Sequence, residues 1–573
     1  IYHYYVNTKT LRISCAQLSF PVGAIQENKE KILNTLKEAE KVHSDIVLFP
    51  ELSLTGYPPE DLLLRESFVG KNFAVMEEIA EFSGKTSGVI GFVDRSLRTQ
   101  KSDNVDRNIT NAAAIVQNGD VKGIYHKCFL PNYSVFDEAR YFDKGLDPSA
   151  LFWYENIAVG INICEDIWIE DGPAEEQVKK GASIILNINA SPFDINKINQ
   201  RKEKVKSKAQ KLKVPIVYLN MVGGQDELVF DGGSFVVDRD GKFLYLAPQF
   251  KEDFFTFDID LEVKDIVSDT NLYVNEKNIK LEELTNTTEM NKVESMYAAL
   301  KLGLTDYVTK NKFNKVLIGL SGGIDSALTA TIACDALSPD HVIGVAMPSK
   351  YNPESSLDDA IQLAKNLGIE IKEISIEETV DNLRLLISKN IDDDLKNVVD
   401  ENIQSRVRGN LLMALSNQLD AMVVSTGNKS EMAVGYATLY GDLVGGFALL
   451  KDVYKADVYN LARYRNSISE VIPQNTIDKE PSAELSENQF DSDSLPNYDT
   501  LDKIIKLYIE EDYSSEKIIS TGIDKDVVYD VLEKIDRNEY KRNQVAPGVK
   551  LTNRAFGKDR RMPITNTYKR DKS

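Results

Sequence analysis

Residues 316–337 read VLIGLSGGIDSALTATIACDAL, and this stretch decides the fold of the second half of the chain. An apolar run is followed by the turn SGGIDS at 321–326 and then by a segment rich in Ala and Leu, which is the order strand, turn, helix. Glycines let backbone N–H groups approach an anion, Ser321 and Ser326 add hydroxyl donors, and the helix N-terminus adds partial positive charge. The stretch therefore predicts a phosphate-binding turn in which Asp325 is placed to hold Mg²⁺.

No lysine follows the glycines, so the Walker A pattern is not met and cleavage of a γ-phosphate is not expected. SGGIDS instead resembles the PP-loop of the ATP pyrophosphatase superfamily. Members of that superfamily bind the pyrophosphate of ATP at this turn and activate a carboxyl or carbonyl oxygen by adenylation. The structural alternative is a plain glycine-rich turn, and the motif alone does not choose a substrate.

Length and composition indicate a multidomain enzyme of ordinary globular type. A chain of 573 residues exceeds one hydrophobic core, so two domains of roughly 250–300 residues are expected. The net charge of −21 argues against nucleic-acid and anionic-membrane partners. Four cysteines without C-x-x-C spacing, no signal peptide and no apolar run of about 18 residues favour a cytoplasmic setting.

The sign of the charge reverses near the C-terminus. Ten Lys or Arg residues fall within 541–573, against Asp559 and Asp571. This basic tail suggests a local phosphate site, with a solvated chain end as the alternative.

The two halves carry different strand patterns. Short apolar runs between 11 and 259 are often joined by too few residues for a crossover helix, which predicts a mixed sheet in a layered α/β sandwich. We place this domain at 1–265, a linker at 266–291 and a doubly wound parallel-sheet domain at 292–573. A helix with one buried stripe is expected at 296–308, and the polar stretch 473–497 is expected to be a mobile loop near a site.

Three reactive residues in the first half follow apolar runs and are predicted to meet at one rim. They are Glu51 in FPELSLTGY, Lys127 in YHKCFLPNY and Cys164 in ICEDIW. A thiol needs a base to become a nucleophile, a carboxylate can accept its proton, and an ammonium can take up oxyanion charge. Together these roles match amide hydrolysis through a thioester, whereas each residue alone is equally typical of a buried filler or a solvated charge.

The same three segments closely resemble the catalytic segments of the nitrilase (carbon–nitrogen hydrolase) superfamily, a four-layer α-β-β-α sandwich. The resemblance implies that Glu51 is the general base, Lys127 the oxyanion stabiliser and Cys164 the nucleophile, with Glu138 as a second carboxylate that orders the site. In the glutamine-using members, the residues that hold glutamine correspond to Tyr133, Ser191 and Lys197. The last of these is often Arg in relatives, so its contact is a departure from the pattern.

Three polar segments in the second half supply cations, carboxylates and amides: ENIQSRVRG (401–409), STGNKSEMAVGYATLYGD (425–442) and VYKADVY (453–459). That inventory suits two phosphorylated ligands and a metal ion. Arg406 and Arg408 point to different faces if helical, so one is expected at a ligand and the other in an internal pair. Glu431 follows a strand end and is a candidate second Mg²⁺ carboxylate beside Asp325.

These segments resemble the NAD⁺ synthetase family, and other PP-loop enzymes lack them. The resemblance implies ATP as co-substrate, with Mg²⁺ on Asp325 and Glu431. It places ATP on Gly319, Leu320, Ser321, Gly322, Gly323, Ile324, Asp325, Ser326, Thr426 and Lys455. It places deamido-NAD, the acid form of NAD⁺, near Asn402, Glu431, Asp442 and Lys541.

With a nitrilase-like half in front, the resemblance extends to the glutamine-dependent members of that family, which amidate deamido-NAD with ammonia from glutamine and form homo-oligomers with an enclosed ammonia channel. Two alternatives remain open. One is an amidotransferase of the same architecture that acts on another adenylated carboxylate. The other is a nitrilase-type amidase whose second domain only senses ATP.

Overall fold

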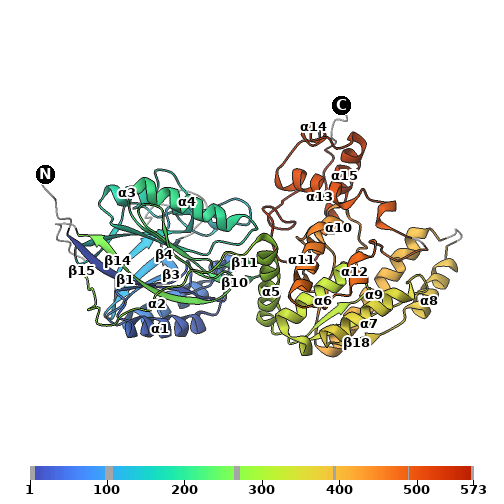
Figure 1. Cartoon of the computed structure of the whole chain (residues 1–573), viewed down its shortest axis with the longest axis horizontal. Helices are drawn as coiled ribbons and strands as arrows, with labels where there is room; N and C mark the ends of the chain where they lie inside the picture. Colours follow the sequence, from blue (N-terminus) through green and yellow to red (C-terminus); the bar gives the residue numbers. More distant parts are fainter. Residues whose placement is uncertain (1–6, 97–107, 264–270, 392–394, 488, 569–573) are drawn as a thin grey trace. The chain divides into compact units, whose positions relative to one another are not determined.

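The computed structural model describes residues 7–96, 108–263, 271–391, 395–487 and 489–568. They form two compact units (Figure 1). Unit 1 comprises Ile1–Gln225 and Val229–Glu289, and unit 2 comprises Asp226–Leu228 and Met290–Ser573. Part of the predicted linker, 266–270, lies outside the described residues.

Unit 1 contains two mixed sheets. The first has six strands, in spatial order β14 (Asp253–Glu262), β1 (Thr8–Gln17), β2 (Ile46–Leu48), β3 (Ser87–Arg95), β4 (Ile109–Gln117) and β5 (Asp120–His126). The second has seven, in the order β13 (Phe243–Leu246), β12 (Phe235–Val237), β9 (Ile216–Asn220), β8 (Ile184–Asn189), β7 (Ile157–Ile163), β6 (Leu151–Tyr154) and β15 (Asn271–Leu272). Parallel and antiparallel pairs occur in both sheets, as the short connections predicted.

The two sheets pack face to face around one core. Ile13, Val89 and Ile115 from the first sheet belong to the same buried cluster as Ile161 and Leu186 from the second. Helices α1 (Ile25–Lys41) and α2 (Glu66–Glu81) cover the first sheet, and α3 (Pro173–Lys179) and α4 (Lys197–Leu212) cover the second (Figure 1). The layers therefore run α-β-β-α, and the predicted sandwich is confirmed.

Unit 2 is built on a five-stranded parallel sheet. Its strands, in spatial order, are β18 (Glu370–Glu373), β17 (Val342–Ala346), β16 (Val316–Gly319), β19 (Met422–Ser425) and β20 (Phe447–Ala448). The order runs outward from β16 in both directions, so the direction of winding reverses at this strand. Ligand crevices in open α/β sheets form outside the strand ends at such a reversal, which is where the SGGIDS turn lies.

Helices cover both faces of this sheet, as expected for a doubly wound fold. The principal helices are α5 (Lys292–Lys310), α6 (Ile324–Leu337), α7 (Glu354–Leu367), α8 (Glu377–Ser388), α9 (Asn397–Leu419), α10 (Lys429–Val434) and α11 (Lys455–Ile468). The predicted buried stripe of α5 is confirmed, since Met296, Leu300, Leu304 and Val308 are at most 1% exposed. A C-terminal helical layer, with α13 (Tyr498–Ile505), α14 (Ser515–Ile519), α15 (Lys525–Arg537) and α16 (Glu539–Arg542), packs around its own apolar cluster.

The stretch 473–497 is more ordered than its composition predicted. It holds the short helix α12 (Gln474–Asp478) and the 3-10 turn η5 (Asp491–Asp493), and it buries Thr476 and Ile477. Residues of this stretch, including Lys479 and Asp491, line a cavity in unit 2. The prediction of a simple loop failed because a run without periodicity still packs when neighbouring helices supply the apolar surface.

Candidate functional site

Three predicted side chains of unit 1 lie just beyond the ends of strands. Lys127 directly follows β5, Cys164 directly follows β7, and Glu51 lies shortly after β2. Their side chains are 0%, 4% and 0% exposed, respectively. Strands β2 and β5 belong to one sheet and β7 to the other. The site is therefore formed by residues that follow strands of both sheets.

The ammonium group of Lys127 is held between two carboxylates. Its Nζ lies 2.7 Å from Glu51 Oε1 and 2.9 Å from each carboxylate oxygen of Glu138. Burial lowers the pKa of Lys127, but the attraction of Glu138 and Glu51 more than offsets this, so the pKa lies well above its usual value. Lys127 is therefore a permanent cation at this site. Burial also raises the pKa of Glu138, and the nearby Glu51 charge adds to that rise.

Further groups hold the two carboxylates in place and were not found from the sequence. Asn111 donates its side-chain amide to Glu51 Oε1 (2.7 Å), and the backbone N–H of Ala190 donates to Glu51 Oε2 (3.0 Å). The hydroxyl of Tyr57 donates to Glu138 Oε1 (2.8 Å). An amide among the apolar residues of the buried run ITNAAAIVQ in β4 was the available signal for Asn111.

Cys164 occupies a strained turn. Its φ of +44° lies in the left-handed region, which is uncommon for a residue with a side chain. Burial raises the pKa of its thiol well above the usual value near 9; Glu51 adds to the rise and Lys127 opposes it. The resting side chain is therefore a neutral thiol. A base must take its proton before it attacks, and Glu51 is the carboxylate with the largest electrostatic effect on it.

Two of the three predicted glutamine contacts, Tyr133 and Lys197, interact electrostatically with this thiol. Tyr133 is 54% exposed and donates its hydroxyl to Glu165 Oε2 (2.9 Å). Lys197 Nζ lies 4.8 Å from the ring centre of Trp168, and burial lowers its pKa. Ser191 is buried, next to the Ala190 N–H that holds Glu51. Glu165, the residue after the thiol, was not predicted, although its charge acts on both Cys164 and Lys197.

The second candidate site is a cavity of about 470 Å³ in unit 2, at the ends of β16 and β19. Most of the predicted nucleotide-binding residues line it. They are Gly319, Leu320, Ser321, Gly323, Ile324, Asp325, Ser326, Asn402, Thr426, Glu431, Asp442, Lys455 and Lys541. Gly322 is the exception and does not line the cavity. Its φ is +80°, and a Cβ there would lie 2.2 Å from the Ser356 carbonyl oxygen. This position therefore requires glycine, which allows the turn to pack against Ser356.

Charged groups from three segments converge in this cavity. Lys455 Nζ lies 2.5 Å from Asp325 Oδ2 and 3.2 Å from Glu431 Oε1. Asn428 donates its side-chain amide to Asp325 Oδ1 (2.8 Å) and accepts the backbone N–H of Glu431 (3.0 Å) as the N-cap of α10. Burial raises the pKa of Glu431, with Lys455 opposing the rise. The attraction of Asp325 and Glu431 outweighs burial and raises the pKa of Lys455.

Three of the predicted deamido-NAD residues, Asn402, Asp442 and Lys541, contact the segment 435–438. Thr438 donates its hydroxyl to Asn402 Oδ1 (2.7 Å) and its backbone N–H to Asp442 Oδ1 (2.7 Å). Lys541 Nζ donates to the carbonyls of Gly435 (2.8 Å) and Ala437 (2.9 Å). The residues of the GYATLYGD segment thus form one wall of the cavity together with these side chains.

Several residues that line the cavity had no role assigned from the sequence. Arg408 lines the cavity, whereas Arg406 is exposed and bonds the Leu439 carbonyl, so the two arginines do occupy different faces. Lys479 and Asp491, from the polar stretch after α11, also line it. No motif marks these two residues in the sequence. In a run without periodicity, the sequence does not indicate which side chains lie on the same side of the backbone.

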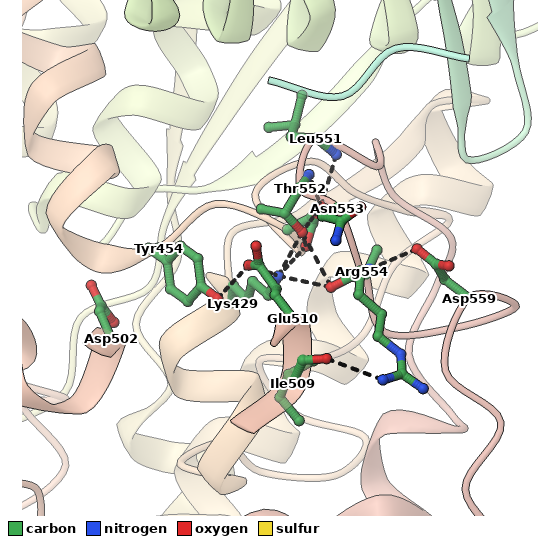
Figure 2. A network of polar contacts seen from close by, with 12 residues as sticks. Lys429, Tyr454, Asp502, Ile509, Glu510, Leu551, Thr552, Asn553, Arg554 and Asp559 are labelled. Carbon is green, nitrogen blue, oxygen red and sulfur yellow. Dashed lines mark hydrogen bonds and ion pairs between the residues drawn. The ribbon is translucent and has the colours of Figure 1, made fainter. Parts of the chain in front are cut away.

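A buried lysine ties the ends of α10 and α11 to the C-terminal segment, and Figure 2 shows this network. Lys429 is fully buried, and its Nζ lies 2.8 Å from Asp452 Oδ1, 3.1 Å from Glu510 Oε1 and 2.7 Å from Thr552 Oγ1. Tyr454, the residue before α11, donates its hydroxyl to the same Glu510 oxygen (2.6 Å). Glu431 and Lys455, which come shortly after Lys429 and Tyr454 in the sequence, line the cavity.

Three cations of the basic C-terminal tail form internal ion pairs, whereas Lys541 lines the cavity and Lys569, Arg570 and Lys572 lie outside the described residues. Lys550 pairs with Asp559 (2.6 Å), Arg560 with Glu539 (2.6 Å) and Arg554 with Asp512 (2.5 Å). The sequence count missed this because the acidic partners of two of these cations lie outside the tail.

Within the described residues, no helix is long and apolar enough to cross a membrane. The same residues hold no cluster of three or more His, Cys, Asp or Glu side chains arranged to bind a metal ion on their own.

Comparison with known proteins assigns a family to each unit. The carbon–nitrogen hydrolase family model matches residues 12–265, and the NAD synthase family model matches residues 296–545. The fold and the two sites therefore define a two-unit enzyme that joins a carbon–nitrogen hydrolase to an NAD synthase.

Full-length relatives narrow this class. The chain is 47% identical to the glutamine-dependent NAD(+) synthetase of Aquifex aeolicus, covering 97% of this chain and 100% of that protein. It is 45% identical to the one from Thermotoga maritima, covering 98% and 99%. A solved glutamine-dependent NAD⁺ synthetase from Acinetobacter baumannii, in complex with ADP, is 40% identical with a TM-score of 0.72, covering 97% and 98%. The chain belongs to the glutamine-dependent NAD(+) synthetase family.

Proposed function

We propose that this enzyme amidates deamido-NAD to NAD⁺ in an ATP-dependent reaction, with glutamine as the nitrogen donor and glutamate, AMP and pyrophosphate as the other products. The observation that carries the proposal is the presence, on one chain, of a buried Glu51–Lys127–Cys164 site and of a cavity that joins the SGGIDS turn to Lys455. The first site suits release of ammonia from an amide. The second suits activation of a carboxylate by ATP.

In unit 1, Glu51 takes the proton of the Cys164 thiol as the sulfur attacks the side-chain amide carbon of glutamine. A lysine ammonium has three N–H donors. Contacts with Glu51 and Glu138 fix the Lys127 ammonium, and its positive charge stabilises the oxyanion of the tetrahedral intermediate. Glu51 then returns the proton to the leaving ammonia. A water deprotonated by Glu51 hydrolyses the thioester to glutamate.

The remaining groups of unit 1 select the substrate. An amino acid carries one positive and one negative α-substituent, and the site offers opposite charges in Lys197 and Glu165. Tyr133 holds Glu165 in position through its hydroxyl, and Ser191 adds a hydroxyl at the Glu51 side. These residues orient glutamine so that its amide faces the thiol.

In unit 2, the turn 319–326, Thr426 and Lys455 hold ATP, while Asn402, Glu431, Asp442 and Lys541 hold deamido-NAD. The nicotinate carboxylate attacks the α-phosphorus and pyrophosphate leaves. Ammonia then attacks the carbonyl carbon of the mixed anhydride, AMP leaves, and the nitrogen loses a proton to give the carboxamide. Adenylation is needed because a carboxylate is a poor electrophile, whereas AMP is a good leaving group.

The site fits Mg²⁺. Asp325 and Glu431 offer hard carboxylate oxygens of the kind that Mg²⁺ prefers, and both would hold the ion together with ATP. Bound Mg²⁺ would neutralise charge on the phosphates.

The proposal includes a cytoplasmic, homo-oligomeric enzyme with an enclosed ammonia path and with domain limits at 1–265 and 292–573. An enclosed path is required because ammonia released into water at neutral pH becomes ammonium, which is not a nucleophile. Size-exclusion chromatography with light scattering tests the oligomer.

The deciding experiment is mass spectrometry of products from the purified chain, Mg-ATP, deamido-NAD and glutamine labelled with ¹⁵N in its amide. Labelled NAD⁺ with AMP and pyrophosphate in equal amounts is the expected result. Glutamate without NAD⁺ would leave the amidase site standing and overturn the assigned acceptor. No ATP cleavage would favour an ATP-sensing second unit.

A further inference from the structure

Asp491 has a buried carboxylate oxygen without a partner. The residue begins η5, its side chain is 5% exposed, and it lines the cavity that also holds Asp325, Glu431 and Lys455. Its Oδ2 accepts the hydroxyl of Tyr498 (2.7 Å). Its Oδ1 is buried and accepts no hydrogen bond of good geometry from the described residues, although the Tyr436 hydroxyl also interacts with this carboxylate. Leaving an anionic acceptor unsatisfied inside a protein is costly, so such an oxygen points to a group that arrives later.

Tyr498 connects this carboxylate to Lys455. The ammonium of Lys455 lies 5.3 Å from the centre of the Tyr498 ring, and the hydroxyl of the same ring contacts Asp491. The Asp491 charge also acts on both Lys455 and Glu431. Asp491 is therefore a neighbour of the Lys455 ion pairs but takes no part in them.

The present partners of Lys455 are the two carboxylates that Mg²⁺ would use. Its Nζ contacts Asp325 (2.5 Å) and Glu431 (3.2 Å) and is almost fully buried. A divalent cation on these oxygens repels an ammonium that remains between them. A buried ammonium that loses its partners must find others, because an unpaired charge in the interior is strongly destabilising.

We propose that Asp491 is a positioning residue that accepts the Lys455 ammonium through its free Oδ1 when Mg-ATP binds, so that Lys455 changes carboxylate partners within the cavity. The inference rests on the proposed function, since it needs Mg-ATP at this site. Tyr498 keeps Oδ2 occupied, so Oδ1 is the oxygen left to receive the ammonium. The exchange holds Lys455 close to the phosphates without an uncompensated charge.

A double-mutant cycle on Mg-ATP affinity tests this exchange in the full-length protein, without deamido-NAD or glutamine. Asp491→Asn is nearly isosteric and keeps an acceptor for Tyr498. By calorimetry it should weaken Mg-ATP binding by about tenfold in the unaltered protein and by less than about twofold in a Lys455→Met background. With EDTA present, ATP affinity should be the same with Asp or Asn, because Lys455 then keeps Asp325 and Glu431. Asp499→Asn, an exposed carboxylate on α13, is the matched control.

Equal losses in both backgrounds would overturn the proposal, because Asp491 would then act on the ligand directly. Unchanged Mg-ATP affinity in Asp491→Asn would overturn it as well. Thermal unfolding verifies that each variant is folded. Tyr498→Phe, which removes the hydroxyl that contacts Oδ2, provides a second variant, and its expected loss of Mg-ATP affinity is smaller than that of Asp491→Asn. Failure of the proposed function is recognised separately: the unaltered protein would bind Mg-ATP but show no pyrophosphate exchange that depends on deamido-NAD.

Discussion

The side-chain amide of Asn428 donates a hydrogen bond to Oδ1 of Asp325 over 2.8 Å, which joins the SGGIDS and TGNKSE segments across 103 residues of sequence. The same asparagine caps α10 by accepting the Glu431 N–H. One residue thus fixes both carboxylates that face Lys455. Its donor and acceptor roles can be separated, because Asp retains the cap but has no N–H to donate.

Asn428→Asp should therefore impair ATP use and also lower stability. The substitution removes the donor to Asp325 and adds a like charge beside it, while the helix cap remains. We expect deamido-NAD-dependent pyrophosphate exchange to fall by about 100-fold. The midpoint of thermal unfolding should also fall, because Asn428 is fully buried and the substitution places a second negative charge against Asp325. Asn428→Ala, which removes the helix cap without adding a charge, separates the two effects. A variant that keeps full exchange activity would contradict the role of this contact.

Cys164→Ala should abolish the use of glutamine and retain synthesis from added ammonium. The sulfur is the only atom removed, and the groups that line the cavity of unit 2 are untouched. NAD⁺ formation from each nitrogen source is the measurement, and Cys128→Ala, at a buried cysteine beside Lys127, is the matched control. Loss of both activities in a folded protein would refute two separate sites.

The thiol of Cys164 should react slowly with iodoacetamide at neutral pH. Its pKa is raised above the usual value near 9, chiefly by burial, so the neutral form dominates below that pH and only the thiolate is reactive. The alkylation rate, followed by peptide mass spectrometry, should rise steadily from pH 6 to 9 (roughly tenfold per pH unit). A plateau already reached near pH 7 would show a preformed thiolate paired with Lys127.

The sequence predicted the residues that stand in motifs and missed those that act through tertiary contacts. Asp325, Glu431 and Lys455 follow strand or helix boundaries in recognisable segments, and the cavity brings them together. Asp491 lies in a polar run whose residues share no face in sequence, and only the packing of 473–497 places it in the same cavity. The layered sandwich and the parallel sheet followed from strand spacing, because connection length limits which strands can pair.

Lys429→Met should destabilise unit 2 by about 3–5 kcal/mol, because it leaves Asp452 and Glu510 buried without their cation. Calorimetric unfolding of the full chain measures the loss. Adding Glu510→Gln should recover part of it, since one uncompensated charge is then removed. Equal stability of the single and double variants would show that the network in Figure 2 is not held by charge balance.

Gly322→Ala should disrupt the phosphate-binding turn, whereas Gly323→Ala should leave its fold intact. The first glycine has φ of +80°, and an added Cβ would lie 2.2 Å from the Ser356 carbonyl, so both the backbone and the α7 contact would have to shift. We expect a loss of about 2 kcal/mol or more, measured by thermal unfolding. At Gly323 the backbone φ is −85°, and the nearest atom is the mobile Ser321 Oγ at 3.3 Å, which can rotate away. If the two variants unfold at the same temperature, the close approach to Ser356 does not constrain the turn.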